Sequence, residues 1–208
     1  MTLNELHELA RSGDFKAAYT AAGLVEGPLE EMLEAQCIGA WSLSRLGRQE
    51  EARAAALSAL DEASRVLGAT HRVTLEAMND SARFAARCGD LATAVEIGTN
   101  VHRIRSEVLG AENPKTLTSL ANLLRYKAAA GQTVDDAAVR MLADGWTAAD
   151  PQVHDPAHLD AWVLAAELTQ DRESAVRCLA RFEQVLGKEH PNTARAREQL
   201  AALLQSTQ

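Results

Sequence analysis

The chain has 208 residues, and its 29 acidic and 21 basic side chains give a formal net charge of −8. A chain of this length buries a core without disulfide or metal support, and its few prolines and glycines exclude a disordered or collagen-like class. The acidic balance argues against a nucleic-acid partner or an anionic membrane surface. Hydrophobic residues make up 47% but aromatic residues only 4%. Alanine and leucine, which are strong helix formers, supply most of that content, so we expect an all-α protein.

The N-terminal segment, the hydropathy and the cysteines together indicate the cellular location. Met1 to Phe15 carries acids and no continuous apolar stretch, which argues against a signal or transit peptide. No window approaches the roughly 18 apolar residues of a membrane span. Cys37, Cys88 and Cys178 are odd in number and have no C-x-x-C spacing, as expected of reduced thiols. We therefore predict a cytoplasmic protein without membrane contact.

Helical periodicity runs through most of the chain. Apolar residues recur at steps of three and four, as in Leu117, Leu120 and Leu124, while glycines separate such stripes and prolines stand near the proposed helix starts. These signals predict five helix hairpins and a closing helix. The predicted helices cover 2–11, 14–23, 28–46, 48–67, 70–88, 90–109, 113–130, 133–149, 155–169, 172–186 and 191–205.

An internal repeat organises these hairpins. Val66-Leu67-Gly68 returns as Val108-Leu109-Gly110, an interval of 42 positions between Gly68 and Gly110. The same interval separates Gly47 from Gly89 and Gly89 from Gly131. Two independent markers with one period indicate a repeat protein in which each unit is a helix hairpin.

The repeated turn resembles that of a known family. Leu109–Leu117 reads Leu-Gly-Ala-Glu-Asn-Pro-Lys-Thr-Leu, which is similar to the signature Leu-Gly-x-x-His-Pro-x-Thr-Leu of the kinesin light chain-like tetratricopeptide repeat (TPR). Leu67–Leu75 fits with Arg72 in place of proline, and a third match contains His190 and Pro191. The 42-residue repeat is also widespread in bacterial proteins, and we expect a bacterial source.

The resemblance implies a right-handed superhelix in one solenoid domain over 1–208. Less regular repeats are expected at 1–27 and 146–186, and a polar capping helix at 191–205. In such repeats the first helix of each hairpin lines a concave groove that binds peptides or partner helices. The resemblance implies no catalytic chemistry.

The repeat phase also predicts which side chains face that groove. Trp41, Arg83 and Arg125 each stand six positions before a marker glycine, and in this repeat type that slot faces the groove together with the residues four before and four after it. The predicted peptide-binding residues are Trp41, Arg45, Asn79, Arg83, Arg87, Asn122 and Arg125, with Cys37, Ala121 and Ala129 beside them.

Arginine and asparagine in this pattern favour one class of partner. A guanidinium pairs bidentately with a carboxylate, and asparagine amides can hold the backbone of an extended chain. The sequence therefore predicts an acidic or C-terminal peptide as the partner. The alternative is that these arginines are ordinary solvated residues that bridge to Glu76 or Asp80.

No motif for catalysis or cofactor binding stands out. His154 and His158 have a spacing that suits a metal, but Asp155-Pro156 looks like a helix start and places His154 outside the helix. We predict no catalytic residue, no metal and no cofactor. Trp146 and Trp162 are expected to pack between helix layers.

Two classes of function remain open. The first is a non-catalytic scaffold or regulator that binds a protein or peptide partner in the concave groove. The second is a sensor of a small ligand or peptide, or an accessory subunit of an enzyme system. The sequence names neither the partner nor the oligomeric state.

Overall fold

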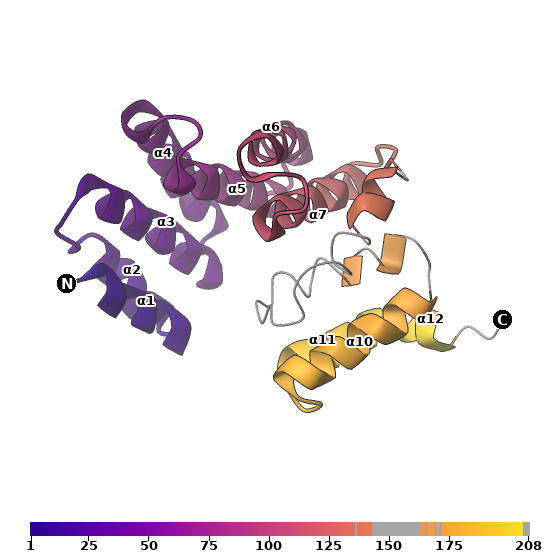
Figure 1. Cartoon of the computed structure of the whole chain (residues 1–208). Coiled ribbons are helices and arrows are strands. Elements are labelled where there is room, and N and C mark those ends of the chain that lie inside the picture. The colour runs from indigo at the N-terminus through magenta and orange to yellow at the C-terminus, as the bar shows by residue number, and fades with distance from the viewer. Residues whose placement is uncertain (136, 143–162, 165, 169, 171, 206–208) are drawn as a thin grey trace. The chain divides into compact units, whose positions relative to one another are not determined.

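The computed structural model describes residues 1–135, 137–142, 163–164, 166–168, 170 and 172–205, and all regular structure in those residues is helical (Figure 1). The chain divides into two compact units, Met1–Val108 and Leu109–Gln208, which are described separately. The all-α prediction is confirmed. A single solenoid over 1–208 stays a prediction.

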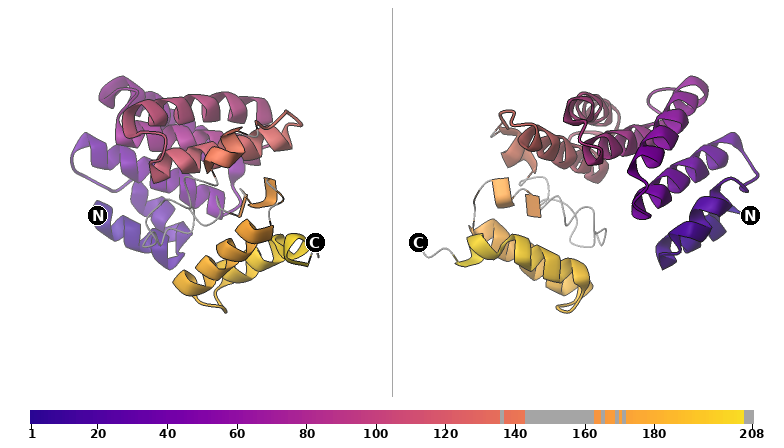
Figure 2. Two further views of the ribbon diagram at one scale, coloured as in Figure 1. Left: turned by 45° about the vertical axis from the view of Figure 1, so that its right-hand side comes forward. Right: turned by 180° about the vertical axis from the view of Figure 1, so that it is seen from behind.

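Three helix hairpins build the first unit. Each predicted helix up to residue 109 is present, with ends that differ by no more than a few positions. Figure 2 shows these hairpins following one another from the N-terminus. The helices are α1 (Leu3–Ser12), α2 (Phe15–Ala22), α3 (Leu29–Arg45), α4 (Gln49–Leu67), α5 (Arg72–Arg87) and α6 (Leu91–Leu109).

The marker glycines end the first helices, as the sequence predicts. Gly47 after α3 has φ 81°, and Gly89 after α5 has φ 82°, a conformation that other residues rarely adopt. The amides of the next residues, Arg48 and Asp90, donate to carbonyls in the last turn of the helix, at 3.0 and 2.9 Å. These bonds satisfy carbonyl groups that the helix itself leaves without a partner.

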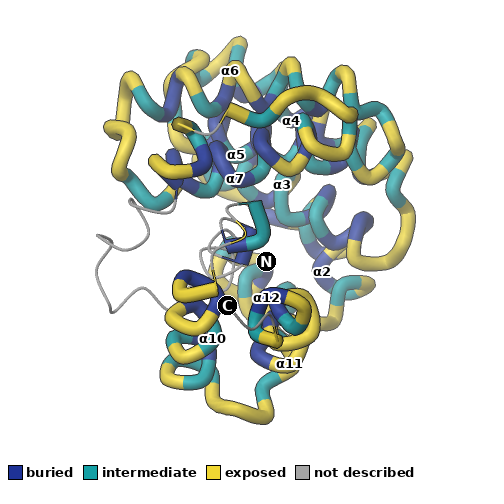
Figure 3. The backbone as a smooth tube through the Cα atoms, turned by 90° about the vertical axis from the view of Figure 1, so that its right-hand side faces the viewer, coloured by how far each residue is buried: buried dark blue, intermediate teal, exposed yellow. Residues whose placement is uncertain are grey.

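The core of the first unit brings α1, α3 and α5 next to one another. Helix α3 contacts α1, α2, α4 and α5. Leu33 of α3 is fully buried with Ala63 of α4 and Val73 of α5, and Phe84 of α5 is fully buried against Ala56 of α4. In Figure 3, buried and exposed residues alternate along each helix, as expected of helices with one side against a neighbour. The first helices of the three hairpins thus form one continuous face.

The second unit contains α7 (Pro114–Ala129), α10 (Arg172–Leu186), α11 (Pro191–Gln199) and α12 (Ala201–Gln205). Helix α7 packs with Val139, Leu142 and Leu164, and α10 packs with α11 and α12 around Phe182. The single closing helix predicted over 191–205 is divided at Leu200 into α11 and α12. Leu200 is fully buried in the same cluster as Phe182, so the interruption lies where the end of the chain packs on α10.

Several predicted features fall outside the described residues. They include Trp146, Trp162, His154 and His158, and much of the less regular repeat expected at 146–186. Among the described helices, none is both long and apolar enough to cross a membrane.

Candidate peptide-binding site

A cavity of about 310 Å³ opens on the face formed by the first helices of the first unit. All three first helices contribute to its wall, so it lies where the repeat phase predicts a groove. Its lining comprises His7, Ala10 and Arg11 of α1, Glu34, Cys37, Ile38 and Trp41 of α3, and Arg72, Val73, Glu76 and Asp80 of α5.

Trp41 forms an aromatic wall of the cavity. Its ring lies edge-on to Phe15, the first residue of α2, with centroids 5.2 Å apart and an interplanar angle of 83°. Such edge-to-face pairs are favourable because the positive ring edge meets the negative face. Phe15 therefore fixes the orientation of Trp41 toward α1 and α2.

Arg45 lies over this aromatic pair. Its guanidinium carbon is 5.1 Å from the Phe15 ring centre and 5.8 Å from that of Trp41. Both distances are within the range of a cation–π interaction. The side chain is exposed, and no carboxylate of the described residues pairs with it. Arg45 is thus a cation next to the cavity that has no carboxylate partner among the described residues.

The predicted residues on α5 have partners within the protein. Arg83 donates through Nη2 to Asp80 Oδ1 at 2.6 Å, and Arg87 donates to the Ser44 hydroxyl. Asn79 is buried, with only 8% of its surface exposed. The bridge from Arg83 to Asp80 is the one named in the alternative interpretation of these arginines.

Arg125 and Asn122 lie on α7, in the second unit. Arg125 is exposed and donates through Nη1 to Asn122 Oδ1 at 3.3 Å. Ala121 beside them is buried and Ala129 is exposed. Because the two units are described separately, a shared role for Arg125 and Arg83 stays a prediction.

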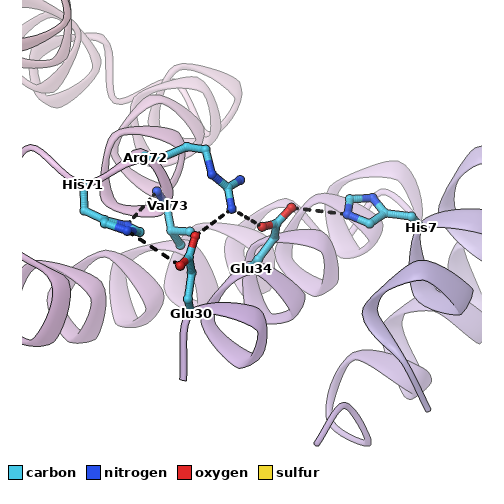
Figure 4. Close-up of polar contacts among 6 residues, drawn as sticks. All are labelled: His7, Glu30, Glu34, His71, Arg72 and Val73. Carbon is cyan, nitrogen blue, oxygen red and sulfur yellow. Dashed lines mark hydrogen bonds and ion pairs between the residues drawn. The ribbon is translucent and has the colours of Figure 1, made fainter. Parts of the chain in front are cut away.

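An ion-pair network across the cavity rim was not predicted from the sequence (Figure 4). Arg72 donates through Nη2 to Glu34 at 2.8 Å and to Glu30 at 2.9 Å. His7 lies 3.2 Å from the other Glu34 oxygen, and His71 lies 3.8 Å from Glu30. The network ties α1, α3 and α5 together. The sequence feature that could have indicated this network is Arg72, which occupies the position of the turn where the repeat signature has proline.

Glu34 is the centre of this network, and its protonation is affected accordingly. Burial raises the pKa of Glu34, but the hydrogen bond and charge of Arg72, together with those of His7, outweigh burial and hold the pKa below its ordinary value. Glu34 therefore remains a carboxylate at neutral pH, and it links two neighbouring first helices to α3.

Carboxylates surround Cys37 in the wall of the cavity. Burial, reinforced by the carboxylates of Asp80, Glu76 and Glu34, raises the pKa of the Cys37 thiol to about 12. Burial also raises the pKa of Asp80, with Arg83 opposing that shift and Glu76 reinforcing it. Cys37 thus stays a neutral thiol and has no nucleophilic character at neutral pH.

Similar proteins were found only among solved structures. A Podosopora anserina kinesin light chain protein of nearly identical TPR-like repeats aligns with a TM-score of 0.61 and 23% identity, over 98% of this chain and 97% of that one. A point variant of it gives a TM-score of 0.63 and 22% identity over the same shares. BtubC (BKLC) from P. vanneervenii gives 0.58 and 14% identity, over 98% of this chain and 80% of that one. No family model and no curated protein matches the chain.

The chain has the TPR-like repeat fold. The predicted resemblance to kinesin light chain-like repeats is thereby confirmed at the level of the fold, while a bacterial source stays a prediction. The likeness to these structures concerns the fold, which is a helical repeat scaffold.

The order of the hairpins accounts for which helices line the cavity. Helices α1, α3 and α5 are the first helices of three consecutive TPR-like hairpins, and the cavity residues Cys37 and Trp41 occupy predicted groove positions. Among the described residues, no cluster of three or more His, Cys, Asp or Glu side chains could hold a metal ion.

Proposed function

We propose that this protein is a non-catalytic, cytoplasmic scaffold that binds an extended segment of a partner protein along α1, α3 and α5. An acidic side chain or a C-terminal carboxylate of that segment pairs with Arg45. The observation that carries the proposal is Arg45, an exposed cation held over Phe15 and Trp41 next to the cavity. Its guanidinium can bind a carboxylate without first breaking an ion pair with a described residue.

The distribution of exposed charge supports an acidic segment. The Arg11 and Arg72 side chains at the rim of the cavity are 65% and 52% exposed, whereas those of Glu34 and Asp80 are 21% and 17% exposed. The Arg11 and Arg72 side chains thus meet solvent, while the Glu34 and Asp80 carboxylates lie deeper. Arg11 and Arg72 pair with the exposed Glu8 and Glu30, so the unpaired positive charge that an acidic segment would meet on this face is that of Arg45.

The remaining residues of the predicted site stay part of the proposal. The exposed guanidinium groups of Arg87 and Arg125 add positive charge to the faces of α5 and α7. The proposed contacts to the partner are Trp41, Arg45, Asn79, Arg83, Arg87, Asn122 and Arg125.

A peptide library with a matched pair of variants tests this function. Short fluorescent peptides that carry Glu, Gln or Lys at one position, with a free or an amidated C-terminus, are titrated by anisotropy. We expect Glu or a free C-terminus to strengthen binding, added salt to weaken it, and Arg45→Gln to weaken it by roughly tenfold or more.

Arg48→Gln is the control, because Arg48 is an exposed arginine that lies 5.2 Å from the Tyr19 ring, pairs with Glu51 and does not line the cavity. Both variants should melt close to the native protein. Equal peptide affinity of Arg45→Gln and the native protein would refute the proposed role of Arg45.

The cavity volume also favours a second candidate, a sensor of a small ligand. About 310 Å³ lies at the lower end of the range for small-molecule sites. Native mass spectrometry of the purified protein separates the two functions. A bound small molecule that peptides displace would support the sensor, and peptide binding to a ligand-free protein supports the scaffold.

A further inference from the structure

Carboxylates converge inside the cavity, beneath the exposed arginines. Glu76 and Asp80 stand one turn apart on α5, and Glu34 lies on α3. Their side chains are 36%, 17% and 21% exposed. A segment bound on this face therefore meets three carboxylate groups on the wall of the cavity.

Arginines outside the cavity hold Glu76 and Asp80 in place. Arg105 of α6, only 2% exposed, pairs with Glu76 at 3.0 Å, and Arg83 pairs with Asp80 through Oδ1. Among the described residues, no hydrogen bond reaches the second oxygen of Asp80, Oδ2. Asp80 is thus fixed in position and keeps an acceptor for a further donor.

The pKa of the Cys37 thiol indicates the sign of the electrostatic potential around this residue. The three carboxylates raise the pKa of its thiol beyond the effect of burial, which means that a negative charge at this point is disfavoured. The same field favours a positive charge. Burial raises the pKa of Asp80 against the opposing charge of Arg83, so its carboxylate form is disfavoured, and an incoming cation would stabilise that form.

The rest of the lining suits the stem of a long side chain. Ile38, Val73 and Ala10 are apolar, and Trp41 adds an aromatic surface. Long basic side chains pack their methylene groups on apolar surface while the charged end reaches a polar group.

We infer that the cavity receives a lysine side chain of the bound segment, with its stem along Ile38, Trp41 and Val73 and its ammonium group at Asp80 and Glu76. The inference rests on the proposed function, which places the segment on this face. Lysine fits better than arginine because Asp80 Oδ1 already accepts from Arg83. A guanidinium pairs best with both oxygens of a carboxylate, whereas an ammonium group binds well to one.

The test uses small probes, so it does not depend on finding the partner. N-acetyl-lysine N-methylamide, the norleucine analogue without the charge and the arginine analogue are each titrated into the native protein. The indole signal of Trp41 is followed by NMR. We expect the lysine probe to shift this signal and to bind roughly tenfold more tightly than either of the others.

Asp80→Asn should remove most of the lysine preference, while Asp61→Asn, which removes the same charge from an exposed position on α4, should leave it intact. The contrast among the three probes in the native protein decides the question even if Asp80→Asn fails to fold. Equal binding of the lysine and norleucine probes, or tighter binding of the arginine probe, would overturn the inference.

These outcomes are separate from those that test the proposed function. Acidic peptides that still bind through Arg45 but show no preference for a neighbouring lysine over norleucine would leave the scaffold function standing and refute the lysine pocket. Binding of the lysine probe at Trp41 without any peptide binding would refute the scaffold function instead.

Discussion

The turns that lead into α5 and α7 are two copies of one pattern, and they differ at one functionally important position. Gly68 and Gly110 have nearly the same φ, 88° and 90°. The next helix begins after a cap whose side chain accepts a backbone N–H: His71 accepts from Val73 at 3.3 Å, and the equivalent Asn113 accepts at 2.9 Å. The shared features are those that end one helix and start the next.

The difference is the first helical residue, which is Arg72 in one copy and Pro114 in the other. The N–H at this position has no partner within the helix, so proline is tolerated there and sets the backbone for the helix. Arginine does not restrict the backbone as proline does, but its side chain reaches Glu30 and Glu34 on the first helix of the previous hairpin. A position that the turn leaves unconstrained is thus used to connect repeats.

The largest effects should come from what the two turns share. Leu75 and Leu117 occupy the same repeat position and are 3% and 1% exposed. Replacing either by alanine should lower the free energy of unfolding by about 2 to 5 kcal/mol, because each change leaves a cavity in a packed core. Urea denaturation measures the loss, and Leu57→Ala at a 41% exposed position is the control. A cost at only one of the two positions would show that the turns are not equivalent.

The caps should give a smaller effect. His71→Ala and Asn113→Ala each remove a side-chain acceptor from the first turn of a helix. We expect a loss of about 1 kcal/mol for each, measured as the midpoint of thermal or urea unfolding. A negligible change at His71 together with the expected change at Asn113 would show that the imidazole does not act as a cap.

The sequence predicted the features that repeat. Helix periodicity and the spacing of Gly47, Gly89 and Gly131 are local patterns, so they located the hairpins and the first-helix face without structural information. The repeat phase also placed Cys37 and Trp41 on the face that carries the cavity.

The sequence left the contact of Arg83 open and did not predict contacts between repeats. Whether Arg83 faces a partner or an acid on its own helix depends on side-chain conformation, which spacing does not determine. In the structure it pairs with Asp80. The link from Arg72 to Glu30 spans 42 positions, and only the packing of α5 on α3 makes it visible. The grouping of carboxylates around Cys37 likewise depends on the positions of two helices.

Glu34→Gln tests the connection between repeats through its dependence on pH. Because its pKa is held below the ordinary value, the native protein releases this proton more readily than the unfolded chain does. The stabilisation is therefore present above the ordinary carboxyl range, near pH 4.3, and is lost as the pH falls through the lower native pKa.

We expect Glu34→Gln to cost about 0.5 to 1 kcal/mol at neutral pH, since Arg72 is half exposed, and nothing in acid. Urea unfolding as a function of pH measures this difference. A constant difference between variant and native protein at every pH would mean that packing, and not charge, accounts for the effect.

Arg72→Pro converts the first turn into a copy of the second and should have the smallest effect on stability. The exposed ion pairs to Glu30 and Glu34 are each worth at most about 1 kcal/mol, and proline at a compatible position returns about 0.4 to 1 kcal/mol by restricting the unfolded chain. The net change in unfolding free energy should therefore be under about 1 kcal/mol.

The pKa of Glu34 should respond more clearly to Arg72→Pro. It should rise, because burial persists while the main opposing cation is gone. A carbon-detected NMR titration of the Glu34 carboxyl measures this shift. Arg11→Gln is the matched control, because Arg11 also lines the cavity but pairs with Glu8 and not with Glu34. If the pKa of Glu34 stays unchanged in Arg72→Pro, the arginine in the proline slot does not connect the repeats electrostatically, and the two turns are equivalent in function as well as in form.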